Sequence, residues 1–305
     1  MHPLPHEVQD RAQGTLLGLA VGDAVGTTVE FSPRGTFEPL TDMVGGGPFN
    51  LRPGQWTDDT SMALCLADSL LTRGRFDPKD QLIRYVRWKR EGYLSSTGRC
   101  FDIGGTVNEA LLRFEASRDP RSGLTSPNSA GNGSIMRLAP VVLAFYPDLV
   151  AIDRRAAESS LTTHGAPEAV ACCRILGGIV GALLAGSEKA EALRSVRPAD
   201  WMSTRLCQVA SAEYRNKEAG EVRGSGYAVD CLEAALWSFE RTGSFEEAVL
   251  LAANLGEDAD TTAAVCGQVA GAWYGASGIP AQWRERTAMS AMIEEWALRL
   301  LEAAF

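Results

Sequence analysis

Residues 168–184, with the sequence EAVACCRILGGIVGALL, are apolar on nearly every side when they are wound as an α-helix. A helix at a protein surface carries an apolar stripe on one side only, so this pattern predicts a helix buried at the centre of a larger bundle. The longest run of small and apolar residues, 175–186, has 12 residues. Because a membrane span needs about 20 residues, we expect a soluble protein with no membrane span.

Helical periodicity extends outward from this segment over most of the chain. Apolar or small residues recur at helical spacing, and Gly74 and Gly243 follow two of the segments as stop signals. The segments are 58–71, 227–239, 263–274 and 289–300. Capping boxes are predicted at two further helix starts, formed by Thr106 with Glu109 and by Ser244 with Glu247.

Strand-like alternation of apolar and polar residues is nearly absent, and no repeat of 20–50 residues appears. We therefore expect an all-α fold with roughly ten or more helices. Residues 45–48 and 117–134 are predicted to be loops, and no linker separates two blocks of sequence. The simplest arrangement is one compact domain over residues 1–305, with a core from about 11 to 300.

Composition and charge restrict the partners. The chain is 45% hydrophobic and has a net charge of −9, which argues against a nucleic-acid partner bound through its phosphates. The basic residues between Arg84 and Arg90 are interpreted as the solvent-exposed face of a helix. The buried face of this helix is predicted to carry Leu82, Ile83 and Val86. We expect a monomer.

The seven cysteines are odd in number and include no CxxC motif. Cys65 stands between Leu64 and Leu66, in an apolar setting. We therefore predict reduced core thiols in a cytoplasmic protein. The first ten residues have neither the basic nor the apolar region of a signal peptide.

Two acidic clusters are candidates for chemistry. Residues 55–60, QWTDDT, place Thr57, Asp58 and Asp59 at the start of an apolar helix, where Asp and Thr are also favoured simply as caps. Residues 254–262, NLGEDADTT, place Asp258, Asp260 and Thr261 at the start of another helix. Crowded carboxylates repel one another unless a positive charge lies among them, and hard divalent cations take carboxylate and hydroxyl oxygens.

If the fold brings the two clusters together, they can form a two-metal centre that activates water and orients a substrate. The residues alone do not decide whether the clusters meet. No zinc site is predicted, because His2, His6 and His164 are far apart and no His/Cys pair has ligand spacing.

Several other segments could belong to the same site. Residues 18–26, GLAVGDAVG, suit either close helix packing or a site, and Glu30 follows them as a candidate acid. The turn 131–134, GNGS, precedes an apolar helix predicted from Ile135, and its amides could hold a phosphate. His164 and Asp102 are candidates that could equally be a structural histidine and a loop acid.

Together these ordered motifs resemble those of the ADP-ribosylglycohydrolase family. The resemblance covers residues 11–274 and includes GDA at 22–24, QWTDDT at 55–60, DIG at 102–104, GNGSIMR at 131–137, TH at 163–164 and NLGEDADTT at 254–262. It implies a compact all-α fold, two Mg²⁺ or Mn²⁺ ions in a cleft, and hydrolysis of the glycosidic bond that joins ADP-ribose to a protein side chain.

The resemblance also implies roles for individual residues. The metal ligands would be Thr57, Asp58, Asp59, Asp258, Asp260 and Thr261, with Asp260 as the bridge. The residues that hold ADP-ribose would be Asp102, Gly131, Asn132, Gly133, Ser134, Met136, His164 and Tyr227. Asp102 would face a guanidinium and Glu30 would lie at the metals, so both would act in catalysis with the four aspartates of the clusters.

Arginine-linked ADP-ribose on a protein is the expected substrate. Two alternatives stay open: hydrolysis of serine-linked or other O-linked ADP-ribose compounds, and non-catalytic binding of ADP-ribose. There are two departures from the family pattern. Gly105 stands where a bacterial member has Asn, which bears on arginine specificity. Glu257 stands where Gly is common, and its side chain could add a charge near the site or point to solvent.

Overall fold

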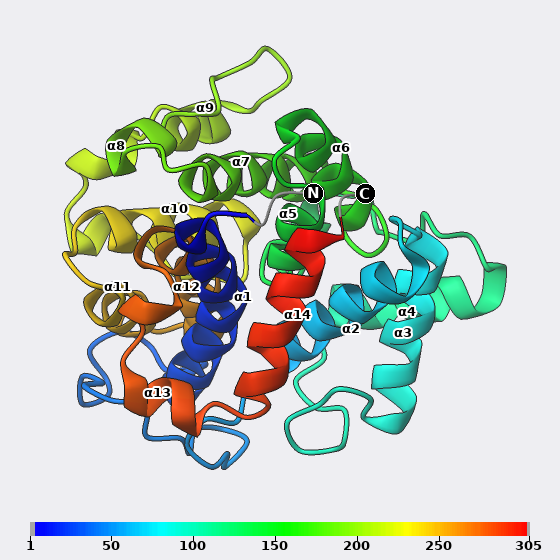
Figure 1. Cartoon of the computed structure of the whole chain (residues 1–305), viewed down its shortest axis with the longest axis horizontal. Helices are drawn as coiled ribbons and strands as arrows, with labels where there is room; N and C mark the ends of the chain where they lie inside the picture. Colours follow the sequence, from blue (N-terminus) through cyan, green and yellow to red (C-terminus); the bar gives the residue numbers. More distant parts are fainter. Residues whose placement is uncertain (1–3, 304–305) are drawn as a thin grey trace.

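The computed structural model describes residues 4–303, and every regular element in that range is helical (Figure 1). The β-type pairings there are three isolated bridges, so the predicted all-α fold is confirmed. The α-helices are α1 (His6–Gly26), α2 (Asp58–Arg73), α3 (Pro78–Glu91), α4 (Gly105–Ser117), α5 (Ala139–Phe145), α6 (Leu149–Ser160), α7 (Pro167–Leu184), α8 (Lys189–Ala192), α9 (Thr204–Ala210), α10 (Ala228–Glu240), α11 (Phe245–Ala253), α12 (Ala259–Tyr274), α13 (Ala281–Arg286) and α14 (Ser290–Glu302). Short 3₁₀ turns are η1 (Thr27–Val29), η2 (Pro127–Ser129), η3 (Glu213–Asn216), η4 (Ala219–Glu221) and η5 (Ala276–Gly278).

Helices α1 and α12 lie side by side and touch at their backbones (Figure 1). A Cβ atom added to Gly22 would lie 2.1 Å from the carbonyl oxygen of Ala263, and one added to Gly267 would lie 2.0 Å from that of Gly18. Such distances are too short for any side chain, so the small residues of 18–26 are required for this contact. The contact places the end of α1 beside the start of α12.

Helix α7 is the predicted central helix, and it begins one residue earlier than expected, at Pro167. Most of its apolar side chains are buried, and those of Ile175, Leu176 and Leu183 are fully buried. Within residues 4–303, α7 is the one helix whose length and mean hydropathy of 1.6 would suit a membrane span, but 72% of it is buried inside the protein. It therefore has the features of a core helix.

Helix starts and stops follow the sequence signals in most places. Gly74 ends α2 in the left-handed conformation, at φ 61°. The Ser244 side chain accepts a hydrogen bond from the Glu247 amide at 3.1 Å and caps α11. The Glu247 carboxylate accepts from the amide of Gly243 at 2.9 Å, one residue before the cap that a capping box would use.

Two predicted helix starts are wrong. Helix α4 begins at Gly105 with no side-chain cap, because the extended residue before it is Gly104; Thr106 lies inside the helix and Glu109 pairs with an arginine one turn on. The helix predicted from Ile135 begins at Ala139. Residues 131–137 form turns instead, so no helix N-terminus lies at the 131–134 loop.

The basic helix and the cysteines largely follow expectation. Helix α3 buries Leu82, but Ile83, which was predicted to lie on the buried face, is 42% exposed. Arg84 pairs with Asp80 at 2.7 Å and also with Asp68, so the basic residues do not form a free positive face. All seven cysteines are free, and five of them are buried. Of the histidines, His2 lies outside the described residues.

Candidate active site

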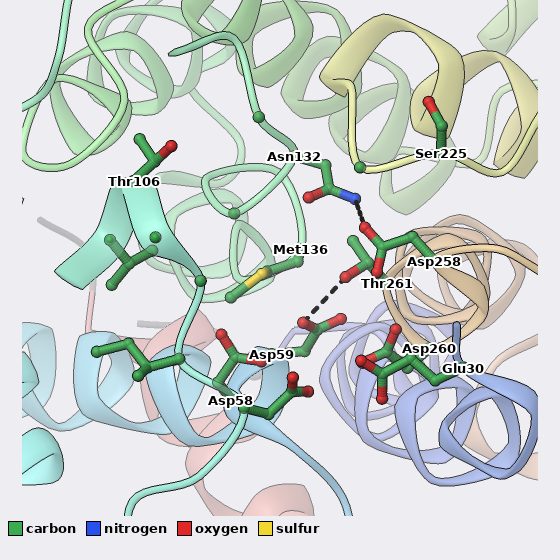
Figure 2. A pocket seen from close by; sticks show the side chains of 18 of the residues that line it. Glu30, Asp58, Asp59, Thr106, Asn132, Met136, Ser225, Asp258, Asp260 and Thr261 are labelled. Atoms are coloured by element: carbon green, nitrogen blue, oxygen red, sulfur yellow. Dashed lines mark hydrogen bonds between the residues drawn. The ribbon is translucent and has the colours of Figure 1, made fainter. Parts of the chain in front are cut away.

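A cleft of about 820 Å³ lies where α2, α12 and the end of α1 meet (Figure 2). Carboxylates from these helices line one side, and backbone-rich loops line the other (Figure 2). The loops contribute residues 102–104, Gly131, Asn132, Gly133 and the Ser225–Gly226 pair, and the first turn of α4 contributes residues 105–107.

Helix α2 contributes its first two residues, Asp58 and Asp59, which are 7% and 0% exposed. Thr57 precedes them but makes no side-chain cap to the helix. Its hydroxyl lies 2.9 Å from Asp23 Oδ1 and 3.2 Å from Asp260 Oδ2. The capping explanation for this cluster therefore fails, because these side chains face other acids rather than the free amides of α2.

Asp23, on α1, contacts the first cluster and is a residue that the sequence reasoning did not single out. Its Oδ1 accepts a hydrogen bond from the Thr57 amide at 2.9 Å, and its Oδ2 accepts from the amide and hydroxyl of Thr60 at 3.0 and 2.6 Å. Asp23 thus caps α2 from a neighbouring helix and fixes the position of the cluster. Its signal in the sequence is that it is the one charged residue in the glycine-rich segment 18–26.

Helix α12 contributes the second cluster. Asp260 is 1% exposed, and the Thr261 hydroxyl donates to Asp59 Oδ1 at 3.2 Å. Asp258 lies at the N-cap position, where its Oδ2 accepts a hydrogen bond from the side-chain amide Nδ2 of Asn132 at 2.6 Å (Figure 2). The cluster is thereby joined both to α2 and to the glycine-rich loop across the cleft.

Glu257 has a backbone conformation that favours glycine, the residue that is common at this position in the family pattern. Its φ is +58°, in the left-handed region that disfavours side chains with a Cβ atom. The Glu257 carboxylate pairs with the exposed guanidinium of Arg223 at 3.1 Å. This departure from the family pattern therefore adds an ion pair at the rim of the cleft.

The two acidic clusters, about 200 residues apart in the chain, meet in the fold. Carboxylate oxygens of Asp58, Asp59 and Asp260 lie within 4.8 Å of one another, and those of Glu30, Asp102 and Asp260 do the same. Asp260 belongs to both groups. Asp258, which the resemblance makes a ligand, belongs to neither group.

Glu30 and Asp102 reach this cluster from loops. Glu30 follows η1 at the end of α1 and is 4% exposed. Asp102 lies between α3 and α4 with a φ of +60°, a strained conformation that Asp tolerates better than most residues. Such strain is typical of residues held in place for function.

Burial and mutual repulsion dominate the electrostatics of the cluster. Burial, followed by the neighbouring carboxylates, raises the pKa values of Asp58, Asp59 and Asp260 well above their ordinary range. The same causes raise the pKa of Glu30 to about 10 and that of Asp102 to about 7. Two buried oxygens, Asp59 Oδ2 and Asp260 Oδ1, have no hydrogen-bond partner among the described residues.

The two buried oxygens without partners indicate whether the site suits a metal ion. Buried anions are stable only when they are paired, protonated or bound to a cation. The donors are carboxylate and hydroxyl oxygens, which suit Mg²⁺ or Mn²⁺, and no histidine or cysteine belongs to either carboxylate group. The residues present therefore fit hard divalent cations.

The glycine-rich loop forms the opposite side of the cleft with Met136 and His164. The side chain of Ser134 points away from the cleft, because its Oγ accepts a hydrogen bond from Ser160 at 3.0 Å. Gly133 must be a glycine, since an added Cβ would lie 2.7 Å from the His164 ring. Burial, and then the charge of Arg137, lowers the pKa of His164 to about 3, so this ring is neutral.

Arg137 is a second residue that the sequence reasoning did not assign. It is fully buried, and its Nη1 donates to the Gly133 carbonyl at 2.7 Å. Its Nη2 donates to the hydroxyl of Thr163 at 2.6 Å, and this hydroxyl lies 2.9 Å from His164 Nδ1. Arg137 thus holds the loop and the histidine together. Its signal is a lone charge in the apolar run 135–145.

Tyr227 lies beside the cleft rather than in it. It lines an adjoining cavity of about 580 Å³ with Glu168, and Gly131 and Gly226 line both spaces. The Tyr227 hydroxyl donates to the Glu168 carboxylate. The two cavities therefore form one continuous surface along the 131–134 loop.

The fold and the site together define an all-helical hydrolase with a carboxylate-lined active site. The family model described as "ADP-ribosylglycohydrolase" matches residues 4–305, and the chain belongs to this family. Its members are glycohydrolases, and this protein is an enzyme of that class.

Individual relatives agree with this assignment. The chain is 47% identical to "ADP-ribosylarginine hydrolase Tri1" of Pseudomonas putida, over 98% of this chain and 80% of the relative. It is 45% identical to the protein of the same name from Serratia proteamaculans, over 98% and 81%. A solved structure titled "ADP-ribosylglycohydrolase-related protein complex" matches with a TM-score of 0.87 and 44% identity, covering 99% of this chain and 100% of that one.

Proposed function

We propose that this enzyme removes ADP-ribose from arginine side chains of modified proteins, with two divalent cations bound at the carboxylate cluster. The observation that carries the proposal is the position of Asp260, which is buried and shared between two groups of converging carboxylates. A shared carboxylate between two ligand sets is the arrangement expected of a bridging ligand.

The proposed cation ligands are those that the resemblance implies: Thr57, Asp58, Asp59, Asp258, Asp260 and Thr261. Glu30 and Asp102 converge on the same oxygens and complete the second group. When bound, Mg²⁺ or Mn²⁺ would supply Lewis acidity for a water molecule and a grip on the hydroxyls of the distal ribose.

The chain's own carboxylates would act on the developing positive charge of the sugar. Glycosidic cleavage passes through an oxocarbenium-like state, and anionic groups near the ribose C1 stabilise it. Carboxylate oxygens of Glu30 and Asp102 converge with those of Asp260, and Figure 2 shows the Glu30 side chain beside Asp260. Both are therefore assigned to catalysis together with Asp58, Asp59, Asp258 and Asp260.

Asp102 is the proposed contact of the leaving group. A carboxylate can accept two parallel hydrogen bonds from a guanidinium, which makes it a suitable partner for arginine. Asp102 lines the cleft, and the exposed residues Gly104 and Gly105 line it just after Asp102 in the chain. The two relatives above are both named ADP-ribosylarginine hydrolase, which supports the same linkage.

The remainder of ADP-ribose would extend along the glycine-rich loop. Gly131, Asn132, Gly133 and the backbone at Ser134 would contact the diphosphate, with Met136 and the neutral His164 beneath it. Tyr227 in the adjoining cavity would contact the far end of the ligand. We further propose that residues 1–305 act as one domain, as a cytoplasmic monomer whose partners are ADP-ribosylated proteins.

Hydrolysis assays test this function. A protein ADP-ribosylated on arginine and one ADP-ribosylated on serine are incubated with Mg²⁺, Mn²⁺ or EDTA, and free ADP-ribose is measured. We expect release from the arginine conjugate, dependent on the cation. Release from the serine conjugate alone would favour an O-linked substrate, and tight ADP-ribose binding without release from either conjugate would favour a binding protein.

A further inference from the structure

A second cavity, of about 650 Å³, lies beside the active site. Its walls are the loop that leads into α2 and the loop that joins α3 to α4. The first loop contributes Arg52 and Gln55, and the second contributes Ser96, Arg99 and Phe101. We call this cavity the acceptor groove.

The walls of the acceptor groove are tied together. The Gln55 side chain donates to the Ser96 carbonyl at 3.0 Å, and the Ser96 hydroxyl donates to the Trp56 carbonyl at 2.6 Å. Trp56 is fully buried, and its indole donates to the Ala288 carbonyl at 3.1 Å. The groove is therefore a formed feature whose walls rest on the core.

The acceptor groove and the cleft adjoin at neighbouring residues and at a chain of aromatic contacts. Phe101 lines the groove and directly precedes Asp102, which lines the cleft. The Phe49 ring lies 5.1 Å from the Phe101 ring and 6.4 Å from that of Phe31, and Phe31 is a 64% exposed wall of the cleft. A chain that leaves Asp102 outward therefore meets these aromatic rings and the groove.

The acceptor groove is positively charged in a protein whose net charge is −9. Arg52 and Arg99 are both exposed, and within residues 4–303 neither guanidinium has a salt bridge or a side-chain hydrogen bond. No aspartate or glutamate lines the groove. Elsewhere on the surface most arginines are paired, as Arg223 is with Glu257.

We propose that the acceptor groove binds an acidic segment of the modified protein, next to the side chain that carries ADP-ribose. This inference rests on the proposed function, because it takes Asp102 to mark the leaving-group end of the cleft. Arg52 and Arg99 would pair with carboxylates of that segment, while the aromatic rings would pack against its backbone. These two arginines would thus determine which modified proteins are preferred.

Peptides that differ only beside the modified residue test the proposal. Each carries one ADP-ribosylarginine, flanked by Glu, Gln or Lys, and free ADP-ribosylarginine serves as the reference substrate. For the wild-type enzyme we expect kcat/KM to be about three- to tenfold higher with Glu than with Gln, the range for one or two exposed ion pairs. Added salt should reduce this ratio.

Two charge variants of the groove sharpen the test. In Arg52→Glu/Arg99→Glu, the preference should reverse toward the Lys-flanked peptide, and in Arg52→Gln/Arg99→Gln it should vanish. Arg154→Glu is the matched control, because Arg154 is exposed on α6, away from both cavities, and should keep the wild-type ratio. Circular dichroism checks that each variant is folded.

A binding measurement separates this proposal from the proposed function. Fluorescence anisotropy of the labelled peptides in EDTA needs no turnover, so it reports on the groove even if the enzyme releases nothing. Tighter binding of the Glu-flanked peptide that is lost in the double variants supports the acceptor groove. Equal affinity for the three peptides, or a Glu preference that survives Arg52→Glu/Arg99→Glu, would overturn it.

Discussion

At the residue scale, Asp260 is subject to two opposite requirements. It is nearly fully buried, and burial together with four neighbouring carboxylates raises its pKa. A site that binds cations must keep this negative charge, although the charge destabilises the folded chain when no cation is bound. Function and stability therefore favour different residues at position 260.

We predict that Asp260→Asn stabilises the metal-free protein by about 1–3 kcal/mol, because it relieves a buried acceptor that has no partner. Urea unfolding in EDTA measures this change. The same variant should lose most ADP-ribose release in Mg²⁺ or Mn²⁺ while its helical circular dichroism stays intact. Wild-type activity in Asp260→Asn would contradict the proposed cation site.

His164 gives a prediction about pH. Its pKa in the folded protein, about 3, lies below the ordinary value of 6.5 because burial and Arg137 disfavour the charged ring. Its contribution to stability is therefore fully present above pH 6.5 and is lost as the pH falls toward 3. Between pH 7.5 and 5 the loss should amount to about 2 kcal/mol, and His164→Gln should not show it.

Nuclear magnetic resonance provides the direct measurement for His164. The ring signals of the folded protein should show no titration between pH 5 and 8. The Gln variant identifies which signals belong to residue 164. A midpoint between pH 5 and 7 for that ring would contradict the buried, neutral assignment.

At the element scale, the contact between α1 and α12 positions both acidic clusters. Asp23 on α1 caps α2, and Asp260 is the second residue of α12. The contact depends on glycines because each backbone occupies the space where the other helix would have a side chain. A small shift between these helices would therefore move the carboxylates apart.

We predict that Gly22→Ala costs about 1–3 kcal/mol, the usual effect of overpacking, and also weakens cation binding. The added Cβ would lie 2.1 Å from a backbone oxygen of α12, which cannot move without moving the helix. Gly220→Ala is the control, since nothing lies within 4 Å of a Cβ at that position. Unfolding in urea and Mn²⁺ titration measure the two effects, and equal stability of both variants would refute the packing argument.

Elements with strong periodicity were predictable, and their starts were less so. The apolar pattern of residues 168–184 identified α7 to within one residue. The pattern could not show that Gly104 rather than Thr106 precedes α4, because a cap depends on backbone angles. It also missed the turns at 131–137, where Arg137 binds the Gly133 carbonyl from within an apolar run.

At the scale of the whole molecule, the site joins parts of the chain that no local pattern connects. The acidic clusters could be recognised from crowding alone, but only the packed helices bring Thr261 to within 3.2 Å of Asp59. Asp23 and Arg137 were missed for the same reason, since each acts on residues of another segment. The metal ligands and the ADP-ribose contacts were therefore predicted from the family resemblance, because residue spacing alone does not indicate them.

Cation binding should stabilise the whole fold, because the ligands come from the ends of several helices. We predict that Mg²⁺ or Mn²⁺ at 100 times its Kd adds about 2.7 kcal/mol to the free energy of unfolding for each cation bound. Differential scanning calorimetry should show a higher Tm that EDTA reverses. NaCl of equal ionic strength is the control, and the same rise in Asp260→Asn would place the effect elsewhere.

The pairing of α1 with α12 also bears on how the protein is made. Helix α1 leaves the ribosome well before its glycine-lined partner, because α1 ends at Gly26 and α12 begins at Ala259. At a translation rate of about 5–20 residues per second, tens of seconds pass between the synthesis of α1 and that of α12. A nascent chain that stops before α12 lacks Asp260, the carboxylate shared by both groups, and leaves α1 uncovered, so the catalytic centre cannot form until α12 has been synthesised.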